Sequence, residues 1–120
     1  MGNVNEQNLP KVIAEVSANH LGSLERAQDL IRLAKDSGAD FVKFQHYRPD
    51  TISVRGQAPE LTLSRGTIWD GRTLWDLYEE AMTPWEWTQE LAAIAEDAGI
   101  SWFSTPFDET AVDFLEGFDV

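Results

Sequence analysis

The sequence predicts an α/β fold in which three strands alternate with helices, and three observations support that prediction. Three apolar runs have strand length, amphipathic segments with helical spacing separate them, and capping residues or glycines stand where those segments begin and end. Alternating strands and helices require a parallel sheet with right-handed crossovers. An open doubly wound sheet and the first part of a (β/α)₈ barrel both fit. A barrel takes roughly 250 residues, so this chain of 120 residues would supply less than half of one.

Apolar patterning and helix caps predict the first three elements. We expect a buried strand over residues 12–20, after a polar leader over residues 1–11. Ser23 is a good N-cap for a helix over residues 24–37, in which apolar residues recur at three- and four-residue spacing. The stretch DFVKFQHY, residues 40–47, is the second expected strand.

The next segment, residues 48–72, has no helical or strand period and many turn residues. Connections of this length without structure of their own are uncommon in compact domains and are usually functional or disordered. Ile68 and Trp69 favour an ordered loop that folds back, with Trp69 as the best candidate for lining a pocket. A short helix is predicted over residues 73–81.

The last part of the chain repeats the helix and strand signals. Residues 83–86, TPWE, form a capping-box pattern with proline at the first helical position, so we expect a helix that ends at Gly99. Its buried stripe would consist of Trp87, Leu91, Ile94 and Ala98. A third strand follows over residues 100–107, and Asp108 is expected to cap a last helix that Gly117 closes.

Composition excludes several classes of function. The 21 acidic and 9 basic residues give a net charge of −12, which disfavours nucleic acid and anionic membranes as partners. A solvated acidic surface accounts for this charge, and adaptation to a salty cytoplasm is the alternative. Without cysteine there is no disulfide framework, thiolate metal site or cysteine nucleophile. No apolar run reaches membrane-spanning length and no signal peptide precedes the strand, so we expect a cytoplasmic protein.

Strand phase places polar side chains on one face of the predicted sheet. Alternate residues of a strand share a face, so Lys43 lies opposite Val42 and Phe44. By the same count, each predicted strand carries polar residues on one face: Glu15 and Ser17; Lys43, Gln45 and Tyr47; and Ser101 and Thr105. Ligands of parallel α/β folds bind at the carboxyl ends of the strands, whether the sheet is open or closed. This row of side chains is therefore the candidate site.

Lys43 poses the main question, because an unpaired buried charge is costly. Glu15 and Lys43 lie on adjacent predicted strands, so they must pair with each other, with water or with a ligand. A plain buried ion pair is one interpretation. The other is an anion site, where Lys43 binds a carboxylate or phosphate and Glu15 acts as acid, base or hydroxyl-binding group. Free N–H groups of the helix after Asp108 would suit phosphate at the same end of the sheet. Lys43 as a Schiff-base nucleophile is a third reading.

The two histidines give a weaker signal. His20 and His46 are 26 residues apart, and neither has a second ligand at helical spacing, so we do not expect them to bind a metal together. His20 follows Asn19 at the end of the first strand, where it either contacts a substrate or plays a structural role.

Four segments together resemble one enzyme family. They are IAEVSANH, GADFVKFQHYRPDT, WDGRTLWDLYEEAMTPWEWTQEL and FSTPFDETAVDFLE. In this order and at these separations they resemble the N-terminal part of the sialic acid synthase family, and within it most closely the pseudaminic acid synthases. The similarity runs from Val12 to Val120. The stretch from Trp69 to Trp87 favours the pseudaminic branch over N-acetylneuraminate or legionaminate synthases.

The resemblance implies the N-terminal part of a (β/α)₈ barrel, about three βα units with parallel strands. The complete enzyme would condense phosphoenolpyruvate with an open-chain amino sugar, giving a nine-carbon α-keto acid and phosphate. For the pseudaminic branch the sugar would be a 2,4-diacetamido-2,4,6-trideoxy-L-altrose. In the family a divalent metal, manganese or magnesium, polarises the sugar's aldehyde and C3 of phosphoenolpyruvate attacks it. Water then adds at C2 before phosphate departs through C–O cleavage.

The resemblance also implies roles for the residues of the candidate site. Lys43 would contact phosphoenolpyruvate, and Thr105 would contact its phosphate. Glu15 would lie between the reactants, where it can orient water or stabilise the cationic intermediate. The remaining expected substrate-binding residues are Gln45, which matches a sugar contact, and Ser104, Asn19 and His20.

Some features depart from the family pattern. Met82 and Thr88 stand where the pseudaminic branch commonly has histidines, and His46 stands where it commonly has threonine. The family's metal-binding histidines and its C-terminal antifreeze-like domain come from later sequence. We therefore expect residues 12–120 to form a partial barrel domain that is inactive alone and whose complete enzyme is a homodimer. A noncatalytic module that binds a small anion is the alternative from another class.

Overall fold

The three predicted strands form one parallel sheet in a computed structural model, which describes residues 9–64 and 66–120. The strands are β1 (Ile13–Glu15), β2 (Phe41–His46) and β3 (Ser101–Pro106), and β2 lies between the other two. Both neighbouring pairs run parallel, which confirms the predicted order of strands and helices. Residues 1–8 of the predicted leader lie outside the described residues.

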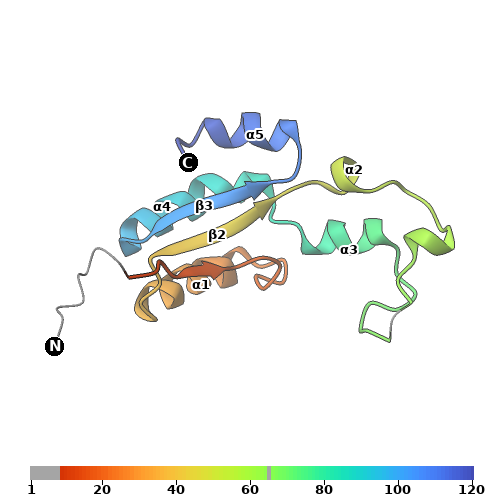
Figure 1. Cartoon of the computed structure of the whole chain (residues 1–120), viewed down its shortest axis with the longest axis horizontal. Coiled ribbons are helices and arrows are strands. Elements are labelled where there is room, and N and C mark those ends of the chain that lie inside the picture. The colour runs from red at the N-terminus through yellow and green to blue at the C-terminus, as the bar shows by residue number, and fades with distance from the viewer. Residues whose placement is uncertain (1–8, 65) are drawn as a thin grey trace.

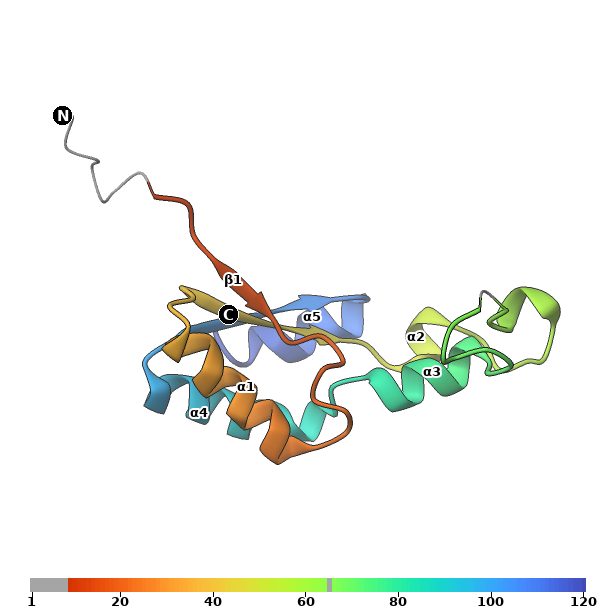
Figure 2. The ribbon, with the colours of Figure 1, turned by 90° about the horizontal axis from the view of Figure 1, so that it is seen from below.

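In the described residues, five helices and two 3₁₀ turns follow or connect the strands. They are α1 (Leu24–Asp36), α2 (Pro49–Ile52), η2 (Pro59–Leu61), α3 (Leu74–Ala81), η3 (Trp85–Trp87), α4 (Thr88–Ala98) and α5 (Glu109–Glu116). Helices α1, α4 and α5 lie on the same side of the sheet, and no described helix covers its other side (Figure 2). None of the described helices is long and apolar enough to cross a membrane.

Residues 49–82, which we call the arm, extend beyond the carboxyl end of β2 (Figure 1). The sequence has no apolar period here and therefore did not predict α2 and η2. Both are short and begin at a proline. The arm is ordered and folds on itself: α2 packs against α3, and Thr62 pairs with Thr73 in an antiparallel bridge. Trp69 is half-buried beneath the Arg72 guanidinium, and its role in lining a pocket stays a prediction.

A core of buried apolar side chains fills the space between the sheet and α1 and α4. Its buried members are Val16, Ala27, Ile31, Ala34, Val42, Phe44, Leu91, Ala95 and Ile100. The stripe predicted for α4 is only partly correct. Leu91 is buried, but the other buried positions of α4 are Thr88 and Ala95, while Trp87, Ile94 and Ala98 are half-buried at the margin of the core.

The first predicted strand is shorter than expected. It was predicted over residues 12–20 but ends at Glu15, because Ser17 and Leu21 adopt left-handed backbone conformations with φ of 48° and 51°. Such conformations interrupt an extended strand. The turn is held by Asn19, whose backbone and side-chain amides both donate to the Val16 carbonyl at 2.9 Å.

The capping box predicted at residues 83–86 does not form. A 3₁₀ turn, η3, precedes α4, and neither has a side-chain cap. The Thr83 hydroxyl lies 3.4 Å from Nε2 of His20 instead, inside the protein. A buried ring nitrogen without a hydrogen-bond partner is energetically costly. The contact with His20 therefore competes with helix capping for the Thr83 hydroxyl.

Four other predicted caps are confirmed: Ser23 and Asp108 begin helices, and Gly99 and Gly117 end them. One of them gives a stability prediction. The Ser23 side chain accepts a hydrogen bond from the Arg26 N–H, as a helix N-cap does. Replacing Ser23 with alanine is expected to lower the free energy of unfolding by about 1 kcal/mol, measured by urea titration. Ser23→Asp keeps an acceptor at the cap and should unfold at nearly the wild-type urea concentration. Equal loss in both variants would contradict the cap's contribution.

Candidate functional site

The uncovered face of the sheet carries the predicted polar row. Along β2, Val42, Phe44 and His46 are buried against the helices, while the alternate residues are half-buried on the other face. In the parallel register Glu15 pairs with Lys43, and Gln45 pairs with Thr105. The four predicted residues therefore share one face, close to the carboxyl ends of the strands.

Glu15 and Lys43 form an ion pair across β1 and β2. The Lys43 ammonium lies 2.7 Å from Oε2 of Glu15, and the backbone N–H of Ser17 donates to Oε1 at 3.2 Å. Their side chains are 35% and 29% exposed in this chain, and the geometry fits both a plain ion pair and an anion site. Ion pairs with this much exposure contribute only about 0–1 kcal/mol. An entering anion can therefore take the ammonium's free donors at little energetic cost.

Gln45 and Thr105 lie one pleat nearer the carboxyl ends of β2 and β3 than Lys43 and Phe103. Both are half-buried, so each presents part of its surface to the open face. The Ser17 hydroxyl donates to Oε1 of Gln45 at 3.4 Å. The amide and the hydroxyl are neutral groups that can donate to and accept from the oxygens of a polar ligand held by Lys43.

Ser17 is the one member of this group that the sequence interpretation did not single out as a site residue. It contacts Glu15 through its backbone and Gln45 through its side chain. Strand phase does place Ser17 on the same face as Glu15, which was the available signal. Its left-handed conformation depends on the turn after β1 and was not predictable from that phase.

Three other predicted substrate-binding residues are not brought together with Lys43. The Asn19 amide holds the turn after β1. His20 is fully buried, accepts the Gly22 N–H at Nδ1, and packs edge-on against Trp87. Ser104 lies on the helix-covered side of β3, with its hydroxyl 2.6 Å from Nδ1 of His46. Burial lowers the pKa of His20, which favours a neutral, structural imidazole.

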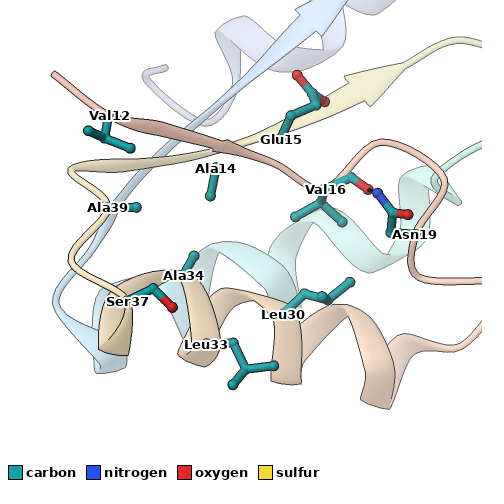
Figure 3. A pocket seen from close by; sticks show the side chains of 10 residues that line it. All are labelled: Val12, Ala14, Glu15, Val16, Asn19, Leu30, Leu33, Ala34, Ser37 and Ala39. Atoms are coloured by element: carbon teal, nitrogen blue, oxygen red, sulfur yellow. Dashed lines mark hydrogen bonds between the residues drawn. The ribbon is translucent and has the colours of Figure 1, made fainter.

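A groove of about 330 Å³ lies between β1 and α1, and Glu15 is one of its lining residues. Figure 3 shows Ala14 and Val16 pointing toward α1, where Leu30 and Ala34 line the same groove, while the Glu15 carboxylate points away from the helix. The groove is largely apolar and follows the free edge of β1. The Glu15 carboxylate, which holds Lys43, therefore points out of this groove.

The start of α5 differs from the expected phosphate site. The Asp108 carboxylate accepts hydrogen bonds from the Thr110 hydroxyl at 2.6 Å and from its N–H at 3.1 Å. These hydrogen bonds lower the pKa of Asp108, and the bond from the Thr110 hydroxyl contributes most. A negative charge therefore lies at the N-terminus of α5. Phosphate at the same amides would meet that charge, which leaves Lys43 as the better anion contact.

The described residues do not by themselves provide a metal site. Within residues 9–64 and 66–120, no group of three or more histidine, cysteine, aspartate or glutamate side chains could hold a metal ion. Glu15 is engaged by Lys43, and the ring nitrogens of His20 and His46 are engaged inside the protein.

Comparison with known proteins shows a consistent set of relatives. The chain is 43% identical over 119 residues to the pseudaminic acid synthase of Campylobacter jejuni and 39% identical over 110 residues to that of Helicobacter pylori. It is 35% identical to the N,N'-diacetyllegionaminic acid synthase of Legionella pneumophila over 104 residues. These matches cover 99%, 92% and 87% of this chain but only 34%, 32% and 29% of the relatives. The chain thus spans about a third of the length of the curated relatives it matches.

Solved structures show the same relation. The N-acetylneuraminic acid synthetase of Leptospira borgpetersenii, crystallised with citrate, superimposes with a TM-score of 0.74 at 26% identity. That match covers 100% of this chain and 38% of the synthetase. The spore coat polysaccharide biosynthesis protein spsE of Bacillus subtilis gives a TM-score of 0.62 at 28% identity, covering 91% of this chain and 27% of spsE.

These likenesses decide between the two architectures that fitted the sequence. The parallel sheet with helices on one side is three βα units of a (β/α)₈ barrel, and not an open doubly wound sheet, which carries helices on both faces. The uncovered face is then the inward face of the barrel. The NeuB family pattern matches residues 30–120, and with this fold and these relatives it shows that the chain belongs to the NeuB family.

Proposed function

We propose that the protein to which this chain contributes is a pseudaminic acid synthase, a transferase of carbohydrate biosynthesis. It condenses phosphoenolpyruvate with 2,4-diacetamido-2,4,6-trideoxy-L-altrose and water, giving a nine-carbon α-keto acid and phosphate. Relatives that are 39% and 43% identical bear the name pseudaminic acid synthase, while the legionaminic relative is 35% identical. That difference supports the pseudaminic branch over the legionaminate and N-acetylneuraminate branches.

The observation that carries this proposal is the accessible ion pair of Glu15 and Lys43 on the inward face of the barrel. Phosphoenolpyruvate bears a carboxylate and a phosphate, and an ammonium is a point charge suited to either. Lys43 binds this substrate, and Thr105, across β2 from β1, donates its hydroxyl to the phosphate. Gln45 contacts the sugar near the carboxyl end of β2.

Glu15 acts between the two substrates in this proposal. When the C3 of phosphoenolpyruvate attacks the aldehyde carbon, positive charge develops at C2, and water adds there. A carboxylate at this position stabilises that charge and orients the water. Phosphate then leaves with its bridging oxygen as the C2–O bond breaks. A divalent metal, manganese or magnesium, would be held by residues outside this chain, and the homodimer expected from the resemblance stays a prediction.

The test is phosphate release by the protein expressed from the complete reading frame that encodes this chain. We expect release from phosphoenolpyruvate only when the L-altrose derivative and a divalent metal are both present. The sugar precursors of N-acetylneuraminate and legionaminate should give at least about tenfold lower kcat/KM, since a site built to hydrogen-bond one sugar leaves polar groups unpaired with another. Release with none of these sugars would contradict the synthase assignment, and preference for another sugar would move the protein to another branch.

A further inference from the structure

A buried hydrogen-bond network lies directly behind the polar row, on the helix-covered side of the sheet. Its centre is His46, the last residue of β2, which is 1% exposed. Nδ1 of His46 lies 2.6 Å from the Ser104 hydroxyl, and Nε2 lies 2.8 Å from the Thr88 hydroxyl. The network thus joins β2 to β3 and to the first residue of α4.

Both nitrogens of the imidazole are satisfied by this arrangement. A neutral imidazole has one N–H and one lone pair, and a hydroxyl can donate or accept, so one hydroxyl donates to the ring while the other accepts from it. The ring also packs against Trp85 and Phe114, with centroids 5.9 Å and 5.7 Å away. A side chain held by two hydrogen bonds and two aromatic rings has a single position.

The network members are the immediate chain neighbours of two predicted ligand contacts. His46 follows Gln45 in β2, and Ser104 precedes Thr105 in β3. Neighbouring strand residues point to opposite faces, so fixing one residue of each pair fixes the backbone that carries the other. Gln45 and Thr105 are partners in the register, which places both contacts over the same part of the network.

We infer that His46, through its hydrogen bonds to Ser104 and Thr88, is a positioning residue that sets the distance between Gln45 and Thr105 on the opposite face of the sheet. The inference rests on the proposed function, since it assigns those two residues to the sugar and to phosphoenolpyruvate. His46 itself touches neither substrate, because the strands separate its ring from the inward face. His46 affects how well Gln45 fits the sugar while Thr105 fits phosphoenolpyruvate.

The first test uses variants of the protein expressed from the complete reading frame. Thr88→Val removes one hydroxyl with little change of volume, and His46→Thr removes the ring. Each is expected to lower kcat/KM about 10- to 100-fold, since a misplacement of ligand-positioning groups by about 1 Å costs up to about 100-fold. The loss should be mainly an increase in the KM values of both substrates.

The exchange variant His46→Thr with Thr88→His separates positioning from packing. It keeps the same side chains and brings an imidazole and a hydroxyl together across the same pair of positions. We expect it to recover at least about tenfold of the kcat/KM lost by His46→Thr, the coupling expected of residues in direct contact. A loss equal to the sum of the two single losses would overturn the pairwise role.

A core variant provides the matched control. Ile31→Val removes one buried methylene from α1, on the far side of the core from the strand ends, and makes no polar contact. It should lower the melting temperature while leaving both KM values within about twofold, as a change in packing distant from the site does. If Thr88→Val lowers the melting temperature and leaves both KM values equally unchanged, His46 is only structural and the inference is wrong.

Failure of the synthase assignment can be distinguished from failure of the positioning role of His46. If the wild-type protein releases no phosphate with any sugar, the synthase assignment fails, and calorimetry with phosphoenolpyruvate alone then tests the positioning of Thr105. Weaker binding by Thr88→Val than by wild type and Ile31→Val would still support the inference. Equal binding by all three, or no binding by the wild type, would overturn it.

Discussion

Replacing Lys43 with alanine is expected to lower kcat/KM of the complete protein for phosphoenolpyruvate by at least about thirtyfold. With substrate bound, Lys43 and the anion would form a charge pair shielded from water, and loss of one partner of such a buried pair costs about 2–5 kcal/mol, where each 1.4 kcal/mol is about a factor of ten. The variant loses the cation that contacts the substrate and leaves Glu15 without the ammonium that lies 2.7 Å from its carboxylate. Both changes disfavour an anion at this site.

Two other lysine variants make the measurement specific. Lys43→Arg keeps the charge and should retain more activity than Lys43→Ala, although an arginine cannot form a Schiff base. Lys35→Ala removes an exposed lysine of α1 that donates to the Gly99 carbonyl at 2.7 Å, outside the barrel face, and should leave kcat/KM within about twofold. If Lys43→Ala retained wild-type kcat/KM, the anion site would be wrong. Borohydride trapping of a carbonyl substrate on Lys43 would instead support the Schiff-base reading.

The features predicted correctly from sequence depend on neighbours in the chain. The alternation of buried and half-buried side chains along β2 follows directly from its period of two residues. The pairing of Glu15 with Lys43 followed from two adjacent parallel strands and from the cost of an unpaired charge. Caps such as Ser23 and Asp108 need only the first turn of a helix.

The features that were missed depend on contacts between distant residues. Thr83 had the sequence pattern of a helix cap, but its hydroxyl serves His20, which stands 63 positions away. Thr88 was noted only as a departure from the pseudaminic pattern, and its partner His46 as another. Nothing local shows that these two positions meet across a strand and a helix, 42 positions apart. A single sequence carries no signal for such pairs.

The predicted helix over residues 73–81 and the predicted folded-back loop are confirmed, but α2 and η2 were missed for a related reason. Residues 48–72 lack an apolar period because the short elements of the arm pack mainly on each other, as α2 does on α3. Tyr47, just before the arm, and Tyr78 in α3 meet at 5.7 Å, so the arm begins beside the carboxyl end of β2. Its position was fixed by this tertiary contact and not by its own propensities.

Acidification gives the second large effect expected of this chain, through the same histidine that holds Ser104 and Thr88. Burial lowers the pKa of His46 from 6.5 to about 4. In the unfolded chain the ring binds a proton as the pH falls below 6.5, while in the folded protein it stays neutral until the pH is near 4. The unfolded state therefore binds more protons in this window, and stability must fall as the pH falls.

The size of the loss follows from the shift in pKa. One unit corresponds to about 1.4 kcal/mol, so the free energy of unfolding should decrease by about 3 kcal/mol between pH 7 and pH 4 through His46. Burial of His20 lowers its pKa and acts in the same direction. The depressed pKa values of Asp40 and Asp108 contribute only below the ordinary aspartate pKa of 3.8, so the histidine window is separate.

Urea unfolding at several pH values between 7 and 4, followed by tryptophan fluorescence, measures this dependence. His46→Gln removes the titrating ring and is expected to flatten the pH dependence, even though it lowers stability at neutral pH by breaking the network. The readout is therefore the slope against pH and not the stability at any one pH. A variant whose slope equals that of the wild type would show that His46 is not held neutral. A flattened slope would show that the folded protein keeps the ring uncharged, the state in which one nitrogen donates and the other accepts.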